Sequence, residues 1–135
     1  MQEFREAVEA RDLDWVGELL AEDVVFTSPV AFEPYRGKPI TQAILSHVIE
    51  VLEGFTYQRE ITDGADSALV FTATVGGRAI TGCDFIRVDE NGRISDFMVM
   101  VRPLSAATKL AEAMGARYEQ IVADASALAG ADTGR

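Results

Sequence analysis

The sequence predicts an α+β domain, in which three to four helices pack against one face of a curved, mixed or antiparallel sheet. Two observations carry this prediction. Apolar residues recur at helical spacing up to about residue 53, and from residue 55 to residue 101 they alternate with polar residues at the period of a strand. Helices gathered before antiparallel strands are typical of a sheet with helices packed against one face. We expect a single domain over residues 1–123 and a frayed tail over residues 124–135.

Each expected helix begins at a recognisable signal. The helices cover residues 2–10, a short segment capped by Asp12 or Asp14, residues 39–53 with Pro39 in the first turn, and a last segment that begins at Pro103. A strand over residues 24–28 is stopped by Pro29. The stretch 33–39 contains two prolines and a glycine and is expected to be a loop.

Four strands follow in hairpin-like succession. They cover residues 55–61, 69–74, 79–88 and 93–101. The tetrapeptide Asp89-Glu90-Asn91-Gly92 between the last two strands is the strongest hairpin signal in the chain. With Val88 paired to Arg93 across this turn, Asp84 is expected to lie opposite Phe97.

One face of this last hairpin carries a lone carboxylate among apolar side chains. The face consists of Ile80, Gly82, Asp84, Ile86, Phe97, Val99 and Val101. Burial disfavours an ionised carboxylate, so the pKa of Asp84 should rise, which makes Asp84 the leading candidate for a catalytic acid or base or for a ligand anchor. The structural alternative is a partly solvated Asp84 whose carboxylate is satisfied by a neighbouring hydroxyl or amide.

The opposite face of the hairpin is apolar as well. It carries Cys83, Phe85, Met98 and Met100, which would form an exposed apolar patch if this side of the sheet met water. A homodimer that buries this outer sheet face is therefore expected.

His47 lies in line with Ile44, Val48 and Val51 on the predicted third helix, so it is expected to point at the core or at the pocket. A neutral imidazole in the pocket could assist Asp84 as a second acid–base group. The alternative is a core histidine whose hydrogen bonds are satisfied.

Composition excludes several classes of function. Twelve basic against twenty-two acidic residues give a net charge of −10, which argues against nucleic-acid binding. The sequence has neither a run of about 20 apolar residues nor a hydrophobic signal core, so no membrane association and a cytoplasmic location are expected. One cysteine and one histidine make a metal cluster improbable. No cofactor is implied, because the chain has neither a phosphate-cradling loop nor a dinucleotide fingerprint.

Several short stretches, taken together, match a known superfamily. They are Ala10-Arg11-Asp12-Leu13-Asp14, Leu20 to Phe26, Ser28-Pro29-Val30, Tyr35-Arg36-Gly37 and Phe85 to Ile94. In this order and spacing, over about residues 2–102, the chain resembles the nuclear transport factor 2-like superfamily, and within it the SnoaL-like branch. The resemblance implies a cone of curved sheet around a pocket, with dimers that pair their sheets. Members of this branch include isomerases, cyclases, epoxide hydrolases and proteins of unknown activity, and the fold does not decide among these.

The ketosteroid isomerases of this superfamily provide a test of one activity. The resemblance places Ser28 where those enzymes carry their general base, Phe4 where they carry a tyrosine oxyanion donor, and Asp84 where they carry a protonated aspartate. A serine at its ordinary pKa does not abstract a proton from carbon without a partner base, and a phenylalanine cannot donate a hydrogen bond. Isomerisation by that mechanism is therefore not expected.

We expect the pocket to bind a small hydrophobic molecule. The expected ligand-binding residues are Phe26, Ser28, Tyr35, Arg59, Phe71, Phe97 and Val99, with Arg59 positioned to neutralise a buried acid or a ligand carboxylate. Three hypotheses remain open: an enzyme that uses Asp84 with help from His47, a non-catalytic binding protein, and a dimeric interaction module that uses the outer sheet face.

Overall fold

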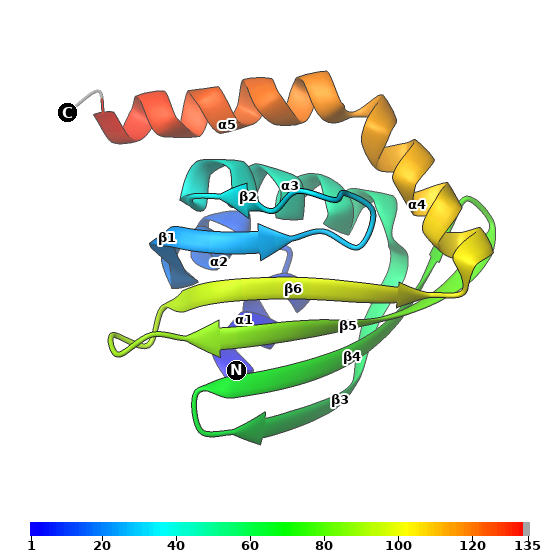
Figure 1. The fold of residues 1–135 in the computed structure, drawn as a ribbon, viewed down its shortest axis with the longest axis horizontal. Coiled ribbons are helices and arrows are strands. Elements are labelled where there is room, and N and C mark those ends of the chain that lie inside the picture. The colour runs from blue at the N-terminus through cyan, green and yellow to red at the C-terminus, as the bar shows by residue number, and fades with distance from the viewer. Residues whose placement is uncertain (134–135) are drawn as a thin grey trace.

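A computed structural model describes residues 1–133 of the chain, and the side chains of residues 1–130. The elements in chain order are α1 (Gln2–Glu9), α2 (Leu13–Leu19), β1 (Leu20–Thr27), β2 (Tyr35–Arg36), α3 (Lys38–Val51), β3 (Glu53–Asp63), β4 (Asp66–Val75), β5 (Arg78–Val88), β6 (Ile94–Arg102), α4 (Leu104–Ala116) and α5 (Tyr118–Thr133). The order agrees with the sequence-based prediction except for two additions. The short strand β2 lies in the expected loop, and α5 follows the last expected helix (Figure 1).

The six strands form one mixed sheet in the order β2-β1-β6-β5-β4-β3. Strands β1 and β6 run parallel, and every other neighbouring pair is antiparallel. The sheet is strongly curved and open, and α3 lies along its concave side (Figure 1). The predicted α+β class and curved sheet are therefore confirmed.

The C-terminal part of the chain differs from its prediction. Instead of one helix and a frayed tail, α4 ends at Ala116 and a second helix, α5, continues to Thr133; residues 134–135 lie outside the described residues. In Figure 1, α5 runs along α3 on the side of α3 that faces away from the sheet. Ile121, Ala125 and Leu128 of α5 pack against the hydrophobic core. Periodicity alone did not reveal α5, because its small residues give only a weak apolar stripe.

The hairpin of β5 and β6 is correctly located, but the predicted pairing is wrong by two residues. Asp84 lies opposite Val99 rather than Phe97, because the turn closes with Val88 opposite Ile94 and an irregularity follows between Arg87 and Val88. Side chains alternate between faces with a period of two, so a shift of two residues leaves the same residues on the inner face. Asp84 therefore still points to the concave side of the sheet, as predicted.

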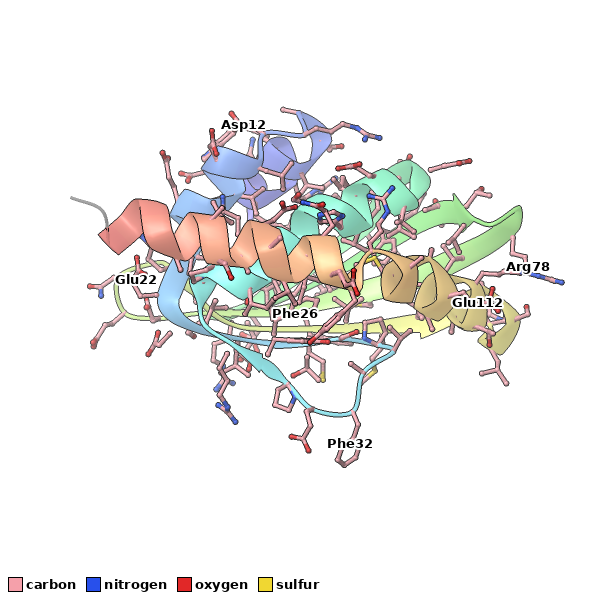
Figure 2. The ribbon with its side chains drawn as sticks, turned by 90° about the horizontal axis from the view of Figure 1, so that it is seen from above. Asp12, Glu22, Phe26, Phe32, Arg78 and Glu112 are labelled. Carbon is pink, nitrogen blue, oxygen red and sulfur yellow. The ribbon has the colours of Figure 1, made fainter. Side chains whose placement is uncertain are left out.

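Local signals set the other boundaries. The Asp12 carboxylate accepts a hydrogen bond of 3.1 Å from the backbone N–H of Trp15, so Asp12 is the N-cap of α2. Gly37 precedes α3 with a φ of 104°, a conformation that suits glycine. The loop between β1 and β2 projects from the body of the protein, and Phe32 at its tip is 95% exposed (Figure 2). No helix among residues 1–133 is long and apolar enough to cross a membrane.

Candidate functional site

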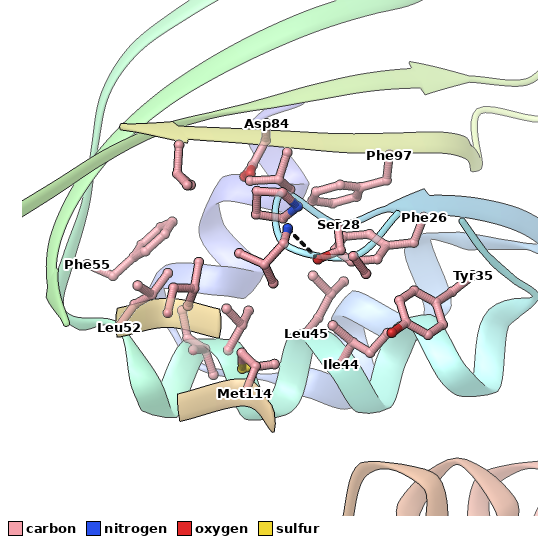
Figure 3. A pocket seen from close by; sticks show the side chains of 18 of the residues that line it. Phe26, Ser28, Tyr35, Ile44, Leu45, Leu52, Phe55, Asp84, Phe97 and Met114 are labelled. Carbon is pink, nitrogen blue, oxygen red and sulfur yellow. Dashed lines mark hydrogen bonds between the residues drawn. The ribbon is translucent and has the colours of Figure 1, made fainter. Parts of the chain in front are cut away.

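A cavity of about 230 Å³ lies between the concave face of the sheet and the helices (Figure 3). Its lining is mostly aliphatic and aromatic, with contributions from the sheet, from α1 to α3, from the loop after β1, and from α4 and the start of α5. Of the residues predicted to bind a ligand, the cavity is lined by Phe26, Ser28, Tyr35, Phe71, Phe97 and Val99, and Asp84 lines it as well. The structure thus brings together most of the site inferred from strand parity.

Asp84 is the polar centre of this cavity. Its side chain is only 6% exposed, and it is the only carboxyl, imidazole or amine group among the described lining residues. Burial raises the pKa of Asp84 to about 7, and a hydrogen bond from Tyr57 offsets part of that rise. Near neutral pH the carboxyl group is therefore present in both protonation states, which a group that accepts and returns a proton requires.

Tyr57 is the partner that the sequence analysis did not single out. Its hydroxyl donates a hydrogen bond of 3.0 Å to Oδ2 of Asp84. Among the described residues this is the one hydrogen bond to the Asp84 carboxylate, so Oδ1 is left for a bound molecule. Burial, together with the negative charge of Asp84, raises the pKa of Tyr57 well above its ordinary value, so this hydroxyl remains a donor.

The ring of Tyr57 is held by its neighbours. It meets Phe55 edge-on with the ring centroids 4.9 Å apart, and the Arg5 guanidinium lies 5.6 Å from its centroid. Arg5 in turn forms an ion pair of 3.2 Å with Glu60. These contacts fix the direction of the hydroxyl toward Asp84, two strands away in the sheet.

Two groups of aromatic rings form walls near Asp84. On one side Phe55 stacks on Phe71 with the centroids 4.7 Å apart, and on the other Phe26 and Phe97 lie 5.4 Å apart (Figure 3). Gly82, opposite Phe71 in the sheet, permits the first group, because a Cβ atom there would lie 2.2 Å from Cζ of Phe71. The ring of Phe71 thus occupies the space that a side chain at position 82 would fill.

Ser28 lines the cavity, but its hydroxyl already has a local role. Its Oγ accepts a hydrogen bond of 3.1 Å from the backbone N–H of Val30 and so fixes the loop after β1 (Figure 3). Neither a histidine nor a second carboxylate lines the described part of the cavity beside it. Ser28 is therefore not arranged as an activated nucleophile or base.

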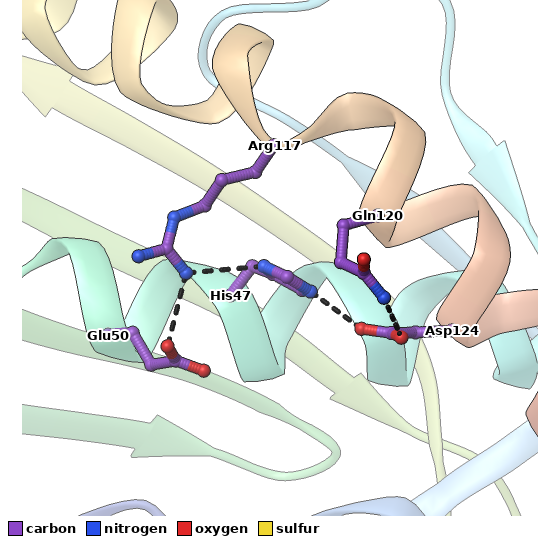
Figure 4. Close-up of polar contacts among 5 residues, drawn as sticks. All are labelled: His47, Glu50, Arg117, Gln120 and Asp124. Carbon is purple, nitrogen blue, oxygen red and sulfur yellow. Dashed lines mark hydrogen bonds and ion pairs between the residues drawn. The ribbon is translucent and has the colours of Figure 1, made fainter.

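His47 does not reach the cavity, and the expected convergence of His47 with Asp84 is not found. Its side chain is buried against α5, where Nε2 lies 2.7 Å from Oδ2 of Asp124 and Nδ1 lies 3.3 Å from Nη1 of Arg117 (Figure 4). A guanidinium only donates, so Nδ1 accepts and Nε2–H donates to Asp124, which describes a neutral imidazole. The hydrogen bond from His47 lowers the pKa of Asp124.

His47 fails to reach the cavity because a second helix, α5, packs on the other side of α3. Because α5 covers α3 from outside, α3 buries two sides, and the side that carries His47 packs on α5 rather than on the pocket. Arg117 also forms an ion pair of 3.2 Å with Glu50, and Gln120 donates to Asp124, which completes a polar cluster between the two helices (Figure 4). His47 is thus a satisfied structural histidine.

Arg59 is also misplaced by the prediction. It is exposed and does not line the cavity. The pairing of β3 with β4 is irregular between Tyr57 and Arg59, so Arg59 lies opposite Val70 on the outer face instead of following Tyr57 inward. A bulge of this kind breaks the alternation on which the prediction depended.

Comparison with known proteins agrees with the fold. The SnoaL-like domain family matches residues 1–97. A steroid delta-isomerase from Pseudomonas aeruginosa is 44% identical over 90% of this chain and 90% of its own, with a TM-score of 0.85. An uncharacterised protein with a cystatin-like fold from Silicibacter pomeroyi is 37% identical over 86% of this chain and 82% of its own, with a TM-score of 0.83.

More distant structures share the fold alone. An NTF2-like protein of unknown function from Mesorhizobium loti is 20% identical over 76% of this chain and 88% of its own, with a TM-score of 0.67. No curated protein matches the chain. The family match over most of its length and the open curved sheet show that the chain belongs to the SnoaL-like domain family of NTF2-like fold.

Proposed function

We propose that the protein binds a neutral, hydrophobic small molecule in the cavity, anchors its oxygen atom at the Asp84–Tyr57 pair, and transfers a proton to or from it through Asp84. The observation that supports this proposal is the isolation of Asp84. It is the only strongly ionisable acid or base among the described lining residues, and its pKa of about 7 makes both of its protonation states available.

The chemistry follows from the two protonation states. Protonated Asp84 donates a hydrogen bond to a carbonyl oxygen of the bound molecule, while the Tyr57 hydroxyl remains the donor to Oδ2. Ionised Asp84 accepts a proton from a hydroxyl group or from a carbon next to a carbonyl group. The steroid delta-isomerase similarity favours a molecule with a carbonyl or hydroxyl group on a ring. The absence of a carboxylate at position 28 favours a reaction in which Asp84 itself is the only proton carrier.

Hydrogen exchange tests the proposal without knowledge of the natural substrate. The two-ring ketone 2-tetralone, incubated with the protein in D₂O, should exchange the hydrogens next to its carbonyl faster than in buffer, as measured by proton NMR. Asp84→Asn should abolish this acceleration. Asp96→Asn is the matched control, because Asp96 is an exposed aspartate on the outer face of the neighbouring strand β6 and should leave the exchange unchanged.

A non-catalytic binding protein is the second candidate. It is favoured by the lack of a second proton-transfer group among the described lining residues, since many proton relays need two. Asp84-dependent binding of 2-tetralone without accelerated exchange would support this candidate against catalysis. Accelerated exchange that persists in Asp84→Asn would contradict the proposed role of Asp84.

A further inference from the structure

We infer that the ligand of this cavity is a planar, uncharged two-ring compound with a hydroxyl or carbonyl oxygen, and not a four-ring one. This inference rests on the proposed function and adds the size and shape of the ligand. Three features of the cavity carry it: its volume, the pair of aromatic rings on either side of Asp84, and the absence of a cation from its described lining.

The volume sets the size. Apolar protein cavities of about 150 Å³ hold benzene, and pockets for drug-sized ligands span roughly 300–1,000 Å³. At about 230 Å³ this cavity lies between the two, which corresponds to a fused pair of six-membered rings. A skeleton of four fused rings has nearly twice as many carbon atoms. It would have to leave part of its surface outside the mouth, so its extra rings would not be buried.

The walls set the shape. The stacked pair Phe55 and Phe71 lies on one side of the cavity, and Phe26 and Phe97 lie on the other, with Asp84 between them (Figure 3). The first pair cannot move outward, because the Phe71 ring rests directly on the backbone of Gly82. Aromatic faces held in this way favour a flat ring system over a puckered one, since a flat ring makes offset-stacked contacts.

The anchor sets the functional group. Oδ1 of Asp84 has no hydrogen bond to the described residues, whereas Oδ2 is occupied by the Tyr57 hydroxyl. One oxygen-bearing group of the ligand therefore finds a partner at Oδ1 of Asp84. No lysine, arginine or histidine lines the described part of the cavity, so a ligand carboxylate would be buried without a counter-charge. The ligand is therefore uncharged.

A series of phenols tests the size limit with the anchoring group held constant. Binding of phenol, 2-naphthol and the four-ring phenol 17β-estradiol is measured by calorimetry. We expect 2-naphthol to bind at least about tenfold more tightly than phenol, because its second ring is buried. We expect 17β-estradiol to bind more weakly than 2-naphthol, and the puckered, saturated decahydro-2-naphthol to do so as well. Binding of 17β-estradiol as tight as that of 2-naphthol, or tighter, would overturn the size limit.

Variants separate the size limit from the proposed function. Met114→Ala shortens a side chain of α4 that lines the cavity and should improve the binding of 17β-estradiol by about fivefold or more, because space is added. Met100→Ala makes the same truncation on the outer face of the sheet. It should leave the affinities for 2-naphthol and 17β-estradiol unchanged. Failure of all three phenols to bind, or binding that Asp84→Asn leaves unchanged, would overturn the proposed function and with it this inference. Asp84-dependent binding that grows tighter with each added ring would overturn the size limit alone.

Discussion

The Tyr57 hydroxyl and the Asp84 carboxylate lie 3.0 Å apart in a cavity that is otherwise almost entirely apolar. The two residues come from β3 and β5, with β4 between them, so their contact depends on the curvature and register of three strands. The hydrogen bond stabilises the ionised form of Asp84, while burial disfavours it, and burial is the larger effect. This balance places the pKa of the Asp84 carboxyl group at about 7, and the first two predictions follow from it.

The stability of the protein should depend on pH through Asp84. Its pKa rises from 3.8 in the unfolded chain to about 7 in the folded protein, so between these values the folded state binds more protons. The contribution of Asp84 to the free energy of unfolding should therefore be largest below about pH 4, decline by on the order of 4 kcal/mol between about pH 4 and pH 7, and be lost above about pH 7. Urea unfolding of the wild type and Asp84→Asn across this range measures the difference between the two profiles. A difference that does not vary with pH would contradict the buried, titrating carboxyl group.

Removal of the Tyr57 hydroxyl should raise the pKa of Asp84 further. Tyr57→Phe keeps the ring and its contact with Phe55 but removes the donor that favours the carboxylate. The measurement is an NMR titration of the ¹³Cγ signal of Asp84. Tyr118→Phe is the control, because Tyr118 lines the same cavity at its more exposed end and should leave the titration unchanged.

The His47 cluster should hold α5 without affecting the chemistry of the cavity. In Asp124→Asn the acceptor of the His47 hydrogen bond loses its charge, so the backbone amides of α5 should exchange hydrogen faster. Since the folded-state pKa of Asp124 is lowered, this stabilising contribution is present above its unfolded pKa and is lost as the pH falls. Hydrogen exchange measured by mass spectrometry detects the change.

Glu119→Gln provides the comparison for this variant, because Glu119 is an exposed acidic residue in the first turn of the same helix. The backbone amides of α5 in Glu119→Gln should exchange hydrogen at the same rate as in the wild type. A shift in the Asp84 titration in Asp124→Asn would show that His47 and the cavity are coupled after all.

Gly82→Ala should be destabilising through a specific clash. The added Cβ would lie 2.2 Å from Cζ of Phe71 and 3.0 Å from the Met100 carbonyl oxygen, so the ring must move into the cavity. We expect a loss of about 1–3 kcal/mol in the free energy of unfolding, measured by urea denaturation. The double variant Gly82→Ala/Phe71→Leu should recover part of the loss relative to the sum of the single variants. Strict additivity would contradict the proposed contact.

The homodimer expected from the sequence stays a prediction, and the outer face of the sheet gives it a test. Ile61, Phe85 and Met100 are 56%, 38% and 54% exposed there, so a second copy of the chain would cover a continuous apolar surface. Sedimentation velocity should show a dimer for the wild type and a monomer for Met100→Glu. Leu104→Glu, which changes an 82% exposed residue of α4, should remain dimeric. A monomeric wild type would contradict the prediction.

The sequence by itself determined the α+β class, the order of the main elements and the direction in which Asp84 points. These features depend on local periodicity and on strand parity, and parity survives a register shift of two residues. Phe26, Phe71, Phe97 and Val99 were assigned to the cavity on the same ground, and the structure places all four in its lining.

Only the tertiary structure decided which polar groups meet. Tyr57 reaches Asp84 across an intervening strand, His47 is satisfied by Asp124, 77 residues away, and a bulge turns Arg59 outward. None of these contacts has a local signal, because each depends on where a second, distant segment packs. Helix α5 illustrates the reason: its composition of small residues says little about its partner, yet its packing on α3 removes the chain's one histidine from the candidate site.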